Sequence, residues 1–236
     1  MKYLVYTPFR CGSSYLTRFL EKNNNTVAVF YDNYKNRLNE ENIVLKAHEC
    51  PTDFCISFDY IFTCIRKPTE IFASAFIKDF KTIILKDNLE EKYPYFYEGD
   101  VSIDKVDSII DFFMSFNWES FEWLSYDFNF SQIEKLTNIN LWNENFDKDK
   151  GYNIFQLNPK LIVIRNDIMF NTDKFINFQE LCREELKFKN LDKGIFSYRN
   201  KDKYGNFYEE FLKRIPKDFY KKYKNVDDQI INKFYQ

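Results

Sequence analysis

The fold is decided by the stretch YLVYTPFRCGSSYLTRF, residues 3–19. Residues 3–7 are apolar and β-prone, which predicts a buried strand. Residues 8–14 contain a proline, one glycine and two serines, which predicts a turn. Apolar residues at helical spacing follow and predict a helix that begins at about Ser13. The stretch therefore predicts a strand, a tight turn and a helix in immediate succession.

Such a turn can bind an anion, because the first N–H groups of a helix have no partner inside the helix. Gly12 would let the backbone approach an anion closely, and Arg10 would add a guanidinium suited to oxyanions. Ser13 and Ser14 would add hydroxyl donors. The alternative is an ordinary turn capped by a serine, and the stretch alone favours neither. A nucleoside triphosphatase loop is excluded, because its lysine follows a second glycine, whereas here the cation precedes a single glycine.

Composition and charge set the broad class of protein. The 236 residues suffice for one α/β domain, residues 1–236, with a large core. A net charge of −2 gives no basis for nucleic-acid binding. Five cysteines without paired spacing favour reduced thiols and a cytoplasmic location over a disulfide framework. We expect no secretory signal, and no apolar run approaches the ~18–20 residues of a membrane span.

Further strands are predicted where short apolar runs recur, at residues 27–31, 43–48, 60–65 and 161–164. Ligands of open α/β sheets lie beyond the carboxyl ends of the strands, so polar residues at those ends are candidate site residues. Helical spacing predicts helices after Thr69, after Ser102 and over residues 172–186, and short helices over residues 207–234 that break at Pro216.

His48 is the only histidine, and it ends the predicted third strand together with Lys46. An imidazole with an ordinary pKa of ~6.5 suits proton abstraction near neutral pH, although a single histidine can equally be structural or merely exposed. Glu49 is a rival base. A metal site made of His48, Cys50 and Cys55 is disfavoured, because it offers three candidate ligands and no second pair.

Arg66 follows the predicted fourth strand, and Ser74 lies eight residues later in the next helix. An arginine at a strand end can bind a phosphate through two hydrogen bonds, and a serine two turns into the helix can donate to the same group. The alternative is a solvated arginine and an ordinary helix serine.

Three segments together resemble the sulfotransferases. The turn at residues 8–14 resembles their 5′-phosphosulfate loop Pro-Lys-Ser-Gly-Thr-Thr, with one extra residue and arginine in place of lysine. Residues 45–51, LKAHECP, resemble their Lys-Thr-His-x-x-Pro region, in which the histidine is the general base. Arg66 and Ser74 match their 3′-phosphate site, and the three matches occur in the family's order.

The resemblance implies an α/β fold, a three-layer parallel sheet flanked by helices of the P-loop NTPase-like sulfotransferase type. It implies 3′-phosphoadenosine 5′-phosphosulfate (PAPS) as sulfuryl donor, adenosine 3′,5′-bisphosphate (PAP) as product, and no metal. Catalysis would fall to Arg10, Lys46 and His48, with Glu49 as the rival base. The expected cofactor-binding residues are Arg10, Cys11, Gly12, Ser13, Ser14, Tyr15, Arg66, Ser74, Arg199, Lys201 and Gly205.

Two later segments extend the resemblance. Residues 161–168 resemble the late sulfotransferase strand, with Asp167 at an acidic position and Asn166 where a tyrosine is usual. Residues 198–207 predict a basic, glycine-containing loop that resembles the family's C-terminal cofactor loop, although Gly-Asp-Trp is replaced by Gly-Asn-Phe. A charged surface loop is the alternative there.

The acceptor is expected to be a sugar hydroxyl. Residues 146–154 resemble a block in a bacterial capsular polysaccharide synthesis family that is itself sulfotransferase-like. The aromatic residues within 118–130 are interpreted as helix core or as an acceptor pocket, and about 93–158 as an acceptor-side helical insertion. Two other functions stay open: an ATP-dependent small-molecule kinase, which the missing lysine disfavours, and a non-catalytic nucleotide-binding protein of a glycan assembly complex. The sequence gives no oligomeric state.

Overall fold

The computed structural model describes residues 1–8, 10–24, 27–30, 42–48, 57–86, 105–115, 126–170, 172–187, 200–216, 219 and 228–236. The described residues fall into two compact units. The first is drawn from Met1–Arg66, Glu122–Ser197 and Gln229–Gln236, and the second from Lys67–Phe121 and Tyr198–Asp228.

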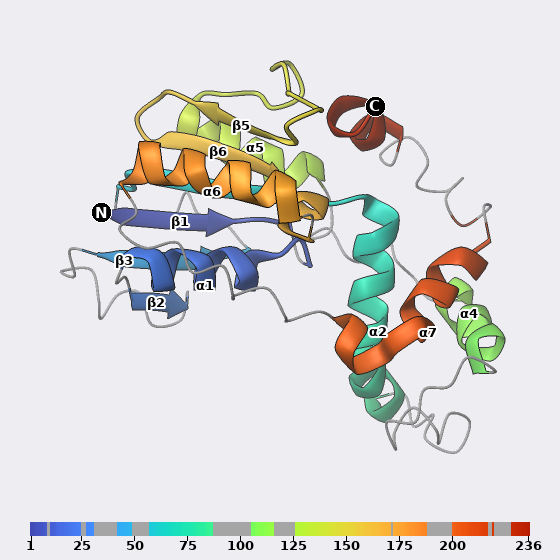
Figure 1. Cartoon of the computed structure of the whole chain (residues 1–236). Helices are drawn as coiled ribbons and strands as arrows, with labels where there is room; N and C mark the ends of the chain where they lie inside the picture. The colour runs from blue at the N-terminus through green and yellow to red at the C-terminus, as the bar shows by residue number, and fades with distance from the viewer. Residues whose placement is uncertain are drawn as a thin grey trace. The chain divides into compact units, whose positions relative to one another are not determined.

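The first unit is built on a sheet whose described strands follow the order β2-β3-β1-β4-β6-β5 (Figure 1). Strands β2, β3, β1, β4 and β6 are parallel to one another, and β5 runs antiparallel to β6 at the edge of the sheet. Strands buried on both faces contain continuous apolar runs, which is why the predicted strands are confirmed to within two residues. The bounds are β1 Lys2–Tyr6, β2 Val27–Phe30, β3 Ile43–Ala47, β4 Tyr60–Ile65, β5 Tyr152–Phe155 and β6 Lys160–Arg165.

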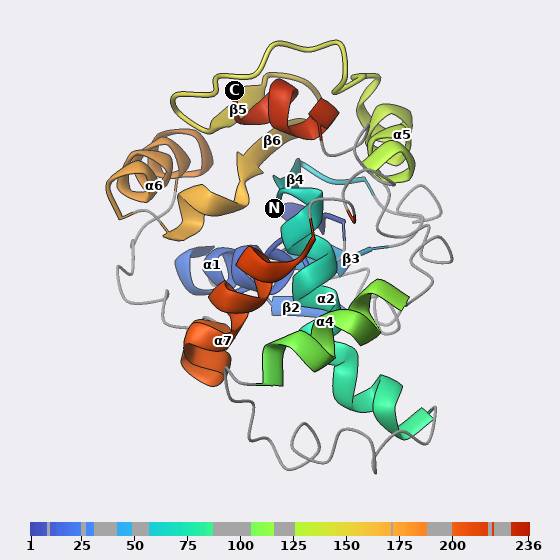
Figure 2. The same cartoon turned by 90° about the vertical axis from the view of Figure 1, so that its right-hand side faces the viewer.

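Helices cover both faces of this sheet, so the expected α/β class is confirmed. Figures 1 and 2 show α1 (Ser13–Asn24) and α6 (Thr172–Leu186) on one face and α5 (Tyr126–Thr137) on the other. The predicted start of α1 at Ser13 and the predicted bounds of α6 are confirmed. Phe19 of α1 contacts Phe175 and Phe178 of α6, with ring centroids 5.7 and 6.1 Å apart.

The direction of the strand order reverses between β1 and β4. After β1 the chain continues to β2 at one edge of the sheet, whereas after β4 the remaining strands add toward the other edge. A crevice forms beyond the carboxyl ends of strands at such a switch point, and ligands of open α/β sheets bind there. The loops that leave β1, β3 and β4 are therefore the expected location of a site.

The second unit consists of α2 (Pro68–Lys86), α4 (Val106–Ser115) and α7 (Asn200–Arg214) in its described part. One aromatic ring from each helix meets in its core: Phe113 lies 5.0 Å from Phe76 and 5.3 Å from Phe211 between ring centroids. The predicted apolar face of α4 is confirmed, because Val106, Ile109, Ile110 and Phe113 are all buried.

The predicted cofactor loop at residues 198–207 is wrong for its described part, because α7 begins at Asn200 and continues through Gly205. Phe207, Phe211 and Ile215 recur every four residues and are all buried. Burial of that stripe outweighs the ~1 kcal/mol by which a glycine weakens a helix. Lys201 and Gly205 are therefore helix residues, and Arg199 lies outside the described residues.

Candidate functional site

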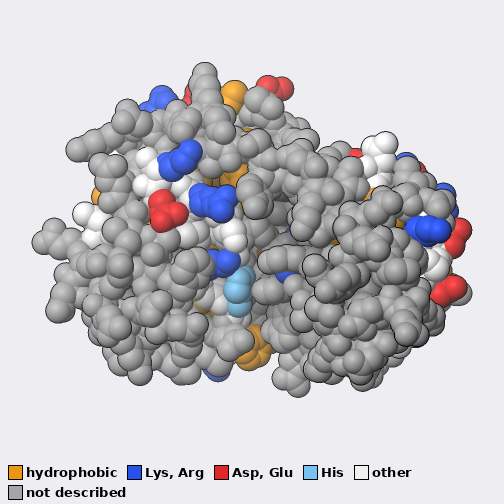
Figure 3. Space-filling view, turned by 90° about the horizontal axis from the view of Figure 1, so that it is seen from below, with side chains coloured by type: hydrophobic (Ala, Val, Ile, Leu, Met, Phe, Trp, Pro, Cys, Tyr) orange, Lys and Arg blue, Asp and Glu red, His pale blue; other side chains and the backbone are white. Residues whose placement is uncertain are grey.

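The first unit brings the loop after β1 together with the end of β3. His48, directly after β3, has its Nδ1 2.9 Å from the carbonyl oxygen of Thr7 and its Nε2 3.3 Å from the Ser13 hydroxyl. A carbonyl oxygen can only accept a hydrogen bond, so Nδ1 carries the proton of the neutral ring. Nε2 therefore carries the lone pair and accepts a hydrogen bond from the Ser13 hydroxyl. Figure 3 shows the chain's single histidine at the surface beside lysine or arginine side chains.

Lys46 supplies a positive charge to the same loop. It lies on β3 two residues before His48, and its Nζ donates to the hydroxyl of Ser14 at 2.9 Å. Alternate residues of a strand share a face, which is why one strand delivers both side chains to one place. The ammonium and the imidazole thus meet two consecutive serines at the start of α1.

The end of β4 meets the other side of the loop. The Nη1 of Arg66 donates to the carbonyl oxygen of Arg10 at 2.9 Å. The hydroxyl of Tyr126 accepts from the Arg66 N–H at 2.7 Å and donates to the Arg66 carbonyl at 2.5 Å. Arg10 has a φ of 64°, a left-handed conformation that costs a non-glycine residue about 1–2 kcal/mol. The Arg66 bond therefore helps to stabilise a strained loop.

Gly12 lies in a left-handed conformation against a neighbouring helix. Its φ is 95°, and a Cβ added there would lie 2.5 Å from Met169 Cε and 3.0 Å from Asn166 Nδ2. Both neighbours belong to the 3₁₀ helix η6 (Asn166–Phe170), whose Asn166 amide also donates to the Cys11 carbonyl at 3.4 Å. The left-handed backbone favours glycine at this position, and η6 packs directly against the loop.

The start of α1 offers donors to an anion. The N–H groups of Tyr15 and Leu16 both donate to the Gly12 carbonyl at 3.0 Å. The backbone N–H groups of Gly12, Ser13 and Ser14 donate to no other group in the described part of the chain. Three adjacent N–H groups beside Lys46 are the donor set that phosphate or sulfate oxygens require.

Two of the predicted cofactor-binding side chains are packed inside the unit. Cys11 is fully buried, with its Sγ 3.6 Å from the Tyr126 hydroxyl. Tyr15 donates to the Met169 carbonyl at 3.4 Å and packs edge-on against Phe175. Burial raises the pKa of the Tyr15 phenol, so it stays neutral.

The remaining predicted residues are not brought to this loop within the described first unit. Ser74 is buried in α2 of the second unit. Lys201 and Gly205 belong to α7 of the same unit. Glu49 and Arg199 lie outside the described residues, as do Cys50, Cys55 and residues 118–125 of the predicted aromatic pocket.

Sequence reasoning missed three groups that organise the site: the carbonyl of Thr7, the hydroxyl of Tyr126 and the amide of Asn166. Each acts through a contact with a residue at least 41 positions away in the chain. The only sequence signal at Tyr126 was its place among the aromatic residues of 118–130. Such a pattern predicts burial, and it does not predict a hydrogen bond to the end of a strand. Burial raises the pKa of the Tyr126 phenol, which keeps it available as both donor and acceptor.

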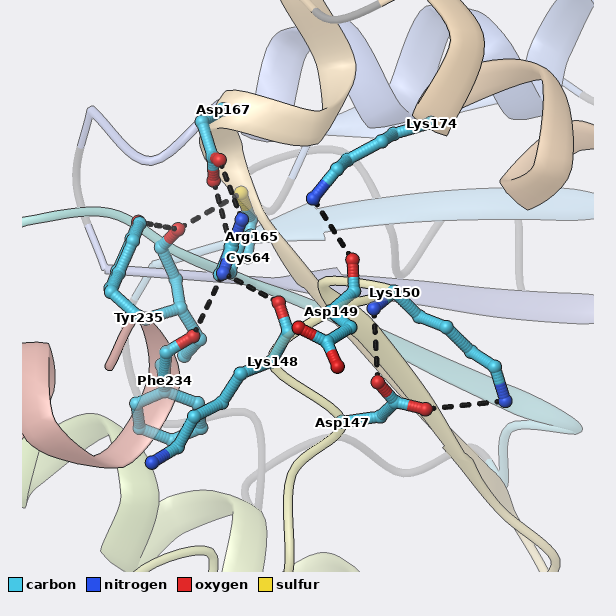
Figure 4. A network of polar contacts seen from close by, with 11 residues as sticks. Cys64, Asp147, Lys148, Asp149, Lys150, Arg165, Asp167, Lys174, Phe234 and Tyr235 are labelled. Atoms are coloured by element: carbon cyan, nitrogen blue, oxygen red, sulfur yellow. Dashed lines mark hydrogen bonds and ion pairs between the residues drawn. The ribbon is translucent and has the colours of Figure 1, made fainter.

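Arg165 at the end of β6 has a structural role (Figure 4). Its guanidinium is buried and donates twice to Asp167, at 2.9 and 2.7 Å. Its Nη1 also donates to the carbonyls of Lys148 and Phe234, at 2.9 and 3.2 Å. One side chain thus joins β6 to the turn before β5 and to the last residues of the chain, and the acidic position predicted at Asp167 is its ion-pair partner.

Comparison with models of known protein families found none that matches the chain, and comparison with curated proteins found no match either. Within the described ranges, no helix combines the length and the apolar character that a membrane crossing needs. Those same ranges contain no cluster of three or more His, Cys, Asp or Glu side chains that could hold a metal ion.

Proposed function

We propose that this chain transfers a sulfuryl group from PAPS to a hydroxyl of a carbohydrate acceptor. One observation carries the proposal: three segments far apart in sequence meet at the switch point of the sheet. They supply the Ser13–His48 contact of 3.3 Å, the Lys46–Ser14 contact of 2.9 Å and the Arg66–Arg10 contact of 2.9 Å.

The donor set fits the anionic half of PAPS. The N–H groups of Gly12, Ser13 and Ser14 and the ammonium of Lys46 would hold the 5′-phosphosulfate, whose oxygens accept but do not donate. The guanidinium of Arg66 would bind a 3′-phosphate, because its planar donors suit phosphate oxygens.

PAPS would supply the activated sulfuryl group. The acceptor oxygen would attack sulfur, the bond from sulfur to the phosphate oxygen would break, and that oxygen would keep the electron pair. His48 Nε2 would take the acceptor's proton once the Ser13 hydroxyl turns away from it. Lys46 and the loop N–H groups would stabilise the charge on the leaving phosphate. Arg10 would add charge near the same group, and Glu49 stays the rival base.

Binding of PAP tests the cofactor. We expect PAP to raise the melting temperature more than ATP at equal concentration, because only PAP carries a 3′-phosphate. In calorimetry, Arg66→Ala should weaken PAP binding by about 1.5–3 kcal/mol, the range for a hydrogen bond to a charged group. Arg214→Ala, on the exposed end of α7, is the matched control.

The other outcomes separate the alternatives. A preference for ATP would favour the kinase, and PAP binding without sulfate transfer to any sugar would favour the non-catalytic protein. Unchanged PAP affinity in Arg66→Ala would contradict the assignment of the 3′-phosphate site.

The Ser13–His48 contact also favours a second candidate, a hydrolase or acyltransferase in which Ser13 is the nucleophile. Its hydroxyl faces a base whose tautomer is fixed by Thr7, and adjacent N–H groups could stabilise an oxyanion. Labelling by a fluorophosphonate probe separates the two candidates. If the chain is a serine hydrolase, the wild type is labelled at Ser13 and the Ser13→Ala variant is not. If it is a sulfotransferase, neither is labelled.

A further inference from the structure

The first unit has a hollow with a volume of about 650 Å³, lined by residues of α5 and of the C-terminal helix at residues 228–234. Its described lining consists of Asp127, Trp142, Gln229, Asn232 and Lys233. The last three recur at spacings of three and four residues, so one face of the C-terminal helix meets the tryptophan. Ile230 and Phe234 of that helix are buried, which fixes the exposed face.

The tryptophan ring is held in place. Its Nε1 donates to a carboxylate oxygen of Asp127 at 3.2 Å, and its backbone N–H donates to Asn140 Oδ1 at 3.0 Å. The ring also packs against Phe130, with centroids 4.9 Å apart and an angle of 63° between the ring planes. A ring held at its nitrogen and against a neighbouring ring loses little conformational entropy when a ligand stacks on it.

The charges in the hollow indicate a neutral ligand. The Asp127 carboxylate accepts the indole N–H, and the Lys233 ammonium donates to the Glu144 carbonyl. Among the described lining residues, one carboxylate and one ammonium therefore balance in charge. A phosphate, a nucleic acid or a basic peptide would gain little there.

The polar groups match hydroxyls. Gln229 and Asn232 each carry a donor and an acceptor, and neither side chain makes a hydrogen bond within the described part of the chain. A sugar hydroxyl also donates and accepts, and the C–H face of a pyranose ring is apolar. The described lining includes no aliphatic side chain, whereas peptide grooves need apolar pockets or a strand edge.

The hollow lies beside the end of β4. Tyr126, next to Asp127, holds the Arg66 backbone, and Tyr235, after Lys233, donates to the Ile65 carbonyl at 3.1 Å. Both helices that form the hollow are therefore fastened to consecutive residues at that strand end. From these observations we infer that the hollow binds a neutral saccharide chain, stacked on Trp142 and hydrogen-bonded by Gln229 and Asn232. This inference does not depend on the proposed sulfuryl transfer.

Affinity electrophoresis of the full chain tests the inference. Native gels are cast with and without neutral polysaccharides (dextran, laminarin, galactomannan and xylan), and a neutral-glycan microarray widens the range of sugars. We expect retardation or array binding by at least one glycan. Trp142→Ala should abolish it, and Gln229→Ala combined with Asn232→Ala should weaken the apparent affinity about 10-fold, because two polar contacts are lost.

Three controls make the result specific. Asn143→Ala changes an exposed residue next to Trp142 outside the lining and should bind as the wild type does. His48→Ala should also bind, which separates this inference from failure of the proposed reaction. If Trp142→Ala lowers the melting temperature, the double amide variant, on an exposed helix face, still decides the question.

The inference is overturned if the wild-type chain binds no neutral glycan in either assay, or if the Trp142 and amide variants bind as the wild type does. Trp142-dependent binding on a peptide array without glycan binding would also overturn it and assign the hollow to peptides.

Discussion

At His48, two contacts determine which ring nitrogen can accept a proton. The sequence placed this residue at a strand end and suggested a base, but it gave no tautomer. The Thr7 carbonyl, 41 residues earlier, keeps the proton on Nδ1 and directs the Nε2 lone pair to Ser13. The role of His48 is therefore decided by a contact between the segments that follow β1 and β3.

Replacement of His48 by alanine tests the proposed base. We expect His48→Ala to abolish transfer of sulfate from PAPS to a sugar acceptor, because the acceptor proton loses its base. Calorimetric affinity for PAP should stay within about threefold of the wild-type value. Turnover that persists in this variant would make Glu49 the candidate base.

Replacement of Arg165 tests how much a single buried guanidinium stabilises the fold. Arg165→Met should lower the free energy of unfolding by about 2–4 kcal/mol, because it removes several charged hydrogen bonds at a buried position. Its matched control is Arg214→Met, whose ion pair with Asp107 is exposed and is expected to contribute less than about 1 kcal/mol. Urea denaturation measures both, and equal losses would contradict the structural role of Arg165.

At the scale of elements, η6 connects the site to the sheet. Its Met169 and Asn166 fill the space beside Gly12, and its Ile168 lies 2.4 Å from a Cβ built on Gly151. Both glycines have positive φ, at 95° and 77°. The backbone of both turns therefore favours glycine, and side chains of η6 pack against both positions.

Gly12→Ala should lower the free energy of unfolding by about 2–4 kcal/mol, the sum of left-handed strain and overpacking. A second change, Met169→Ala, should recover part of that loss in the double variant, because it removes the nearest atom but leaves the strain. Chemical denaturation of the single and double variants measures the coupling. An additive pair would show that Met169 does not constrain Gly12.

Gly205→Ala distinguishes a helix from a loop in α7. Alanine is favoured over glycine by about 1 kcal/mol inside a helix, so this variant should be more stable than the wild type. The predicted cofactor loop requires the opposite result, with reduced stability or weaker PAP binding. A melting curve with and without PAP separates these outcomes.

At the scale of the whole molecule, an ion pair fastens α6 to the sheet of the first unit. Lys160 at the start of β6 donates to Glu185 near the end of α6 at 2.8 Å, and this hydrogen bond lowers the pKa of Glu185. The folded state therefore binds the Glu185 proton less readily than the unfolded state. The stabilisation is present above the unfolded pKa of about 4.3 and is lost as the pH falls through the lower folded value.

Glu185→Gln should accordingly reduce the difference in melting temperature between pH 7 and low pH, because it removes this titration. Glu184→Gln, at an exposed position of the same helix, is the control. Melting temperatures measured from about pH 6 down to pH 3 should converge for Glu185→Gln and the wild type at the acid end. Parallel curves over the whole range would contradict the role of this pair.

The sequence by itself determined the elements of this protein: the parallel strands, the start of α1, the bounds of α6 and the buried face of α4. These depend on periodicity and turn residues, which are local properties of the chain. It also placed Arg10, Lys46, His48 and Arg66 at the ends of strands.

Only the tertiary structure decided which of these groups meet and what each contacts. Ser13 faces His48 across 35 residues, Tyr126 holds Arg66 across 60, and η6 packs against Gly12. Residues 200–207 became helical because a buried aromatic stripe outweighed a local glycine and charged residues. Contacts of this kind depend on strand order and packing, which no local pattern encodes.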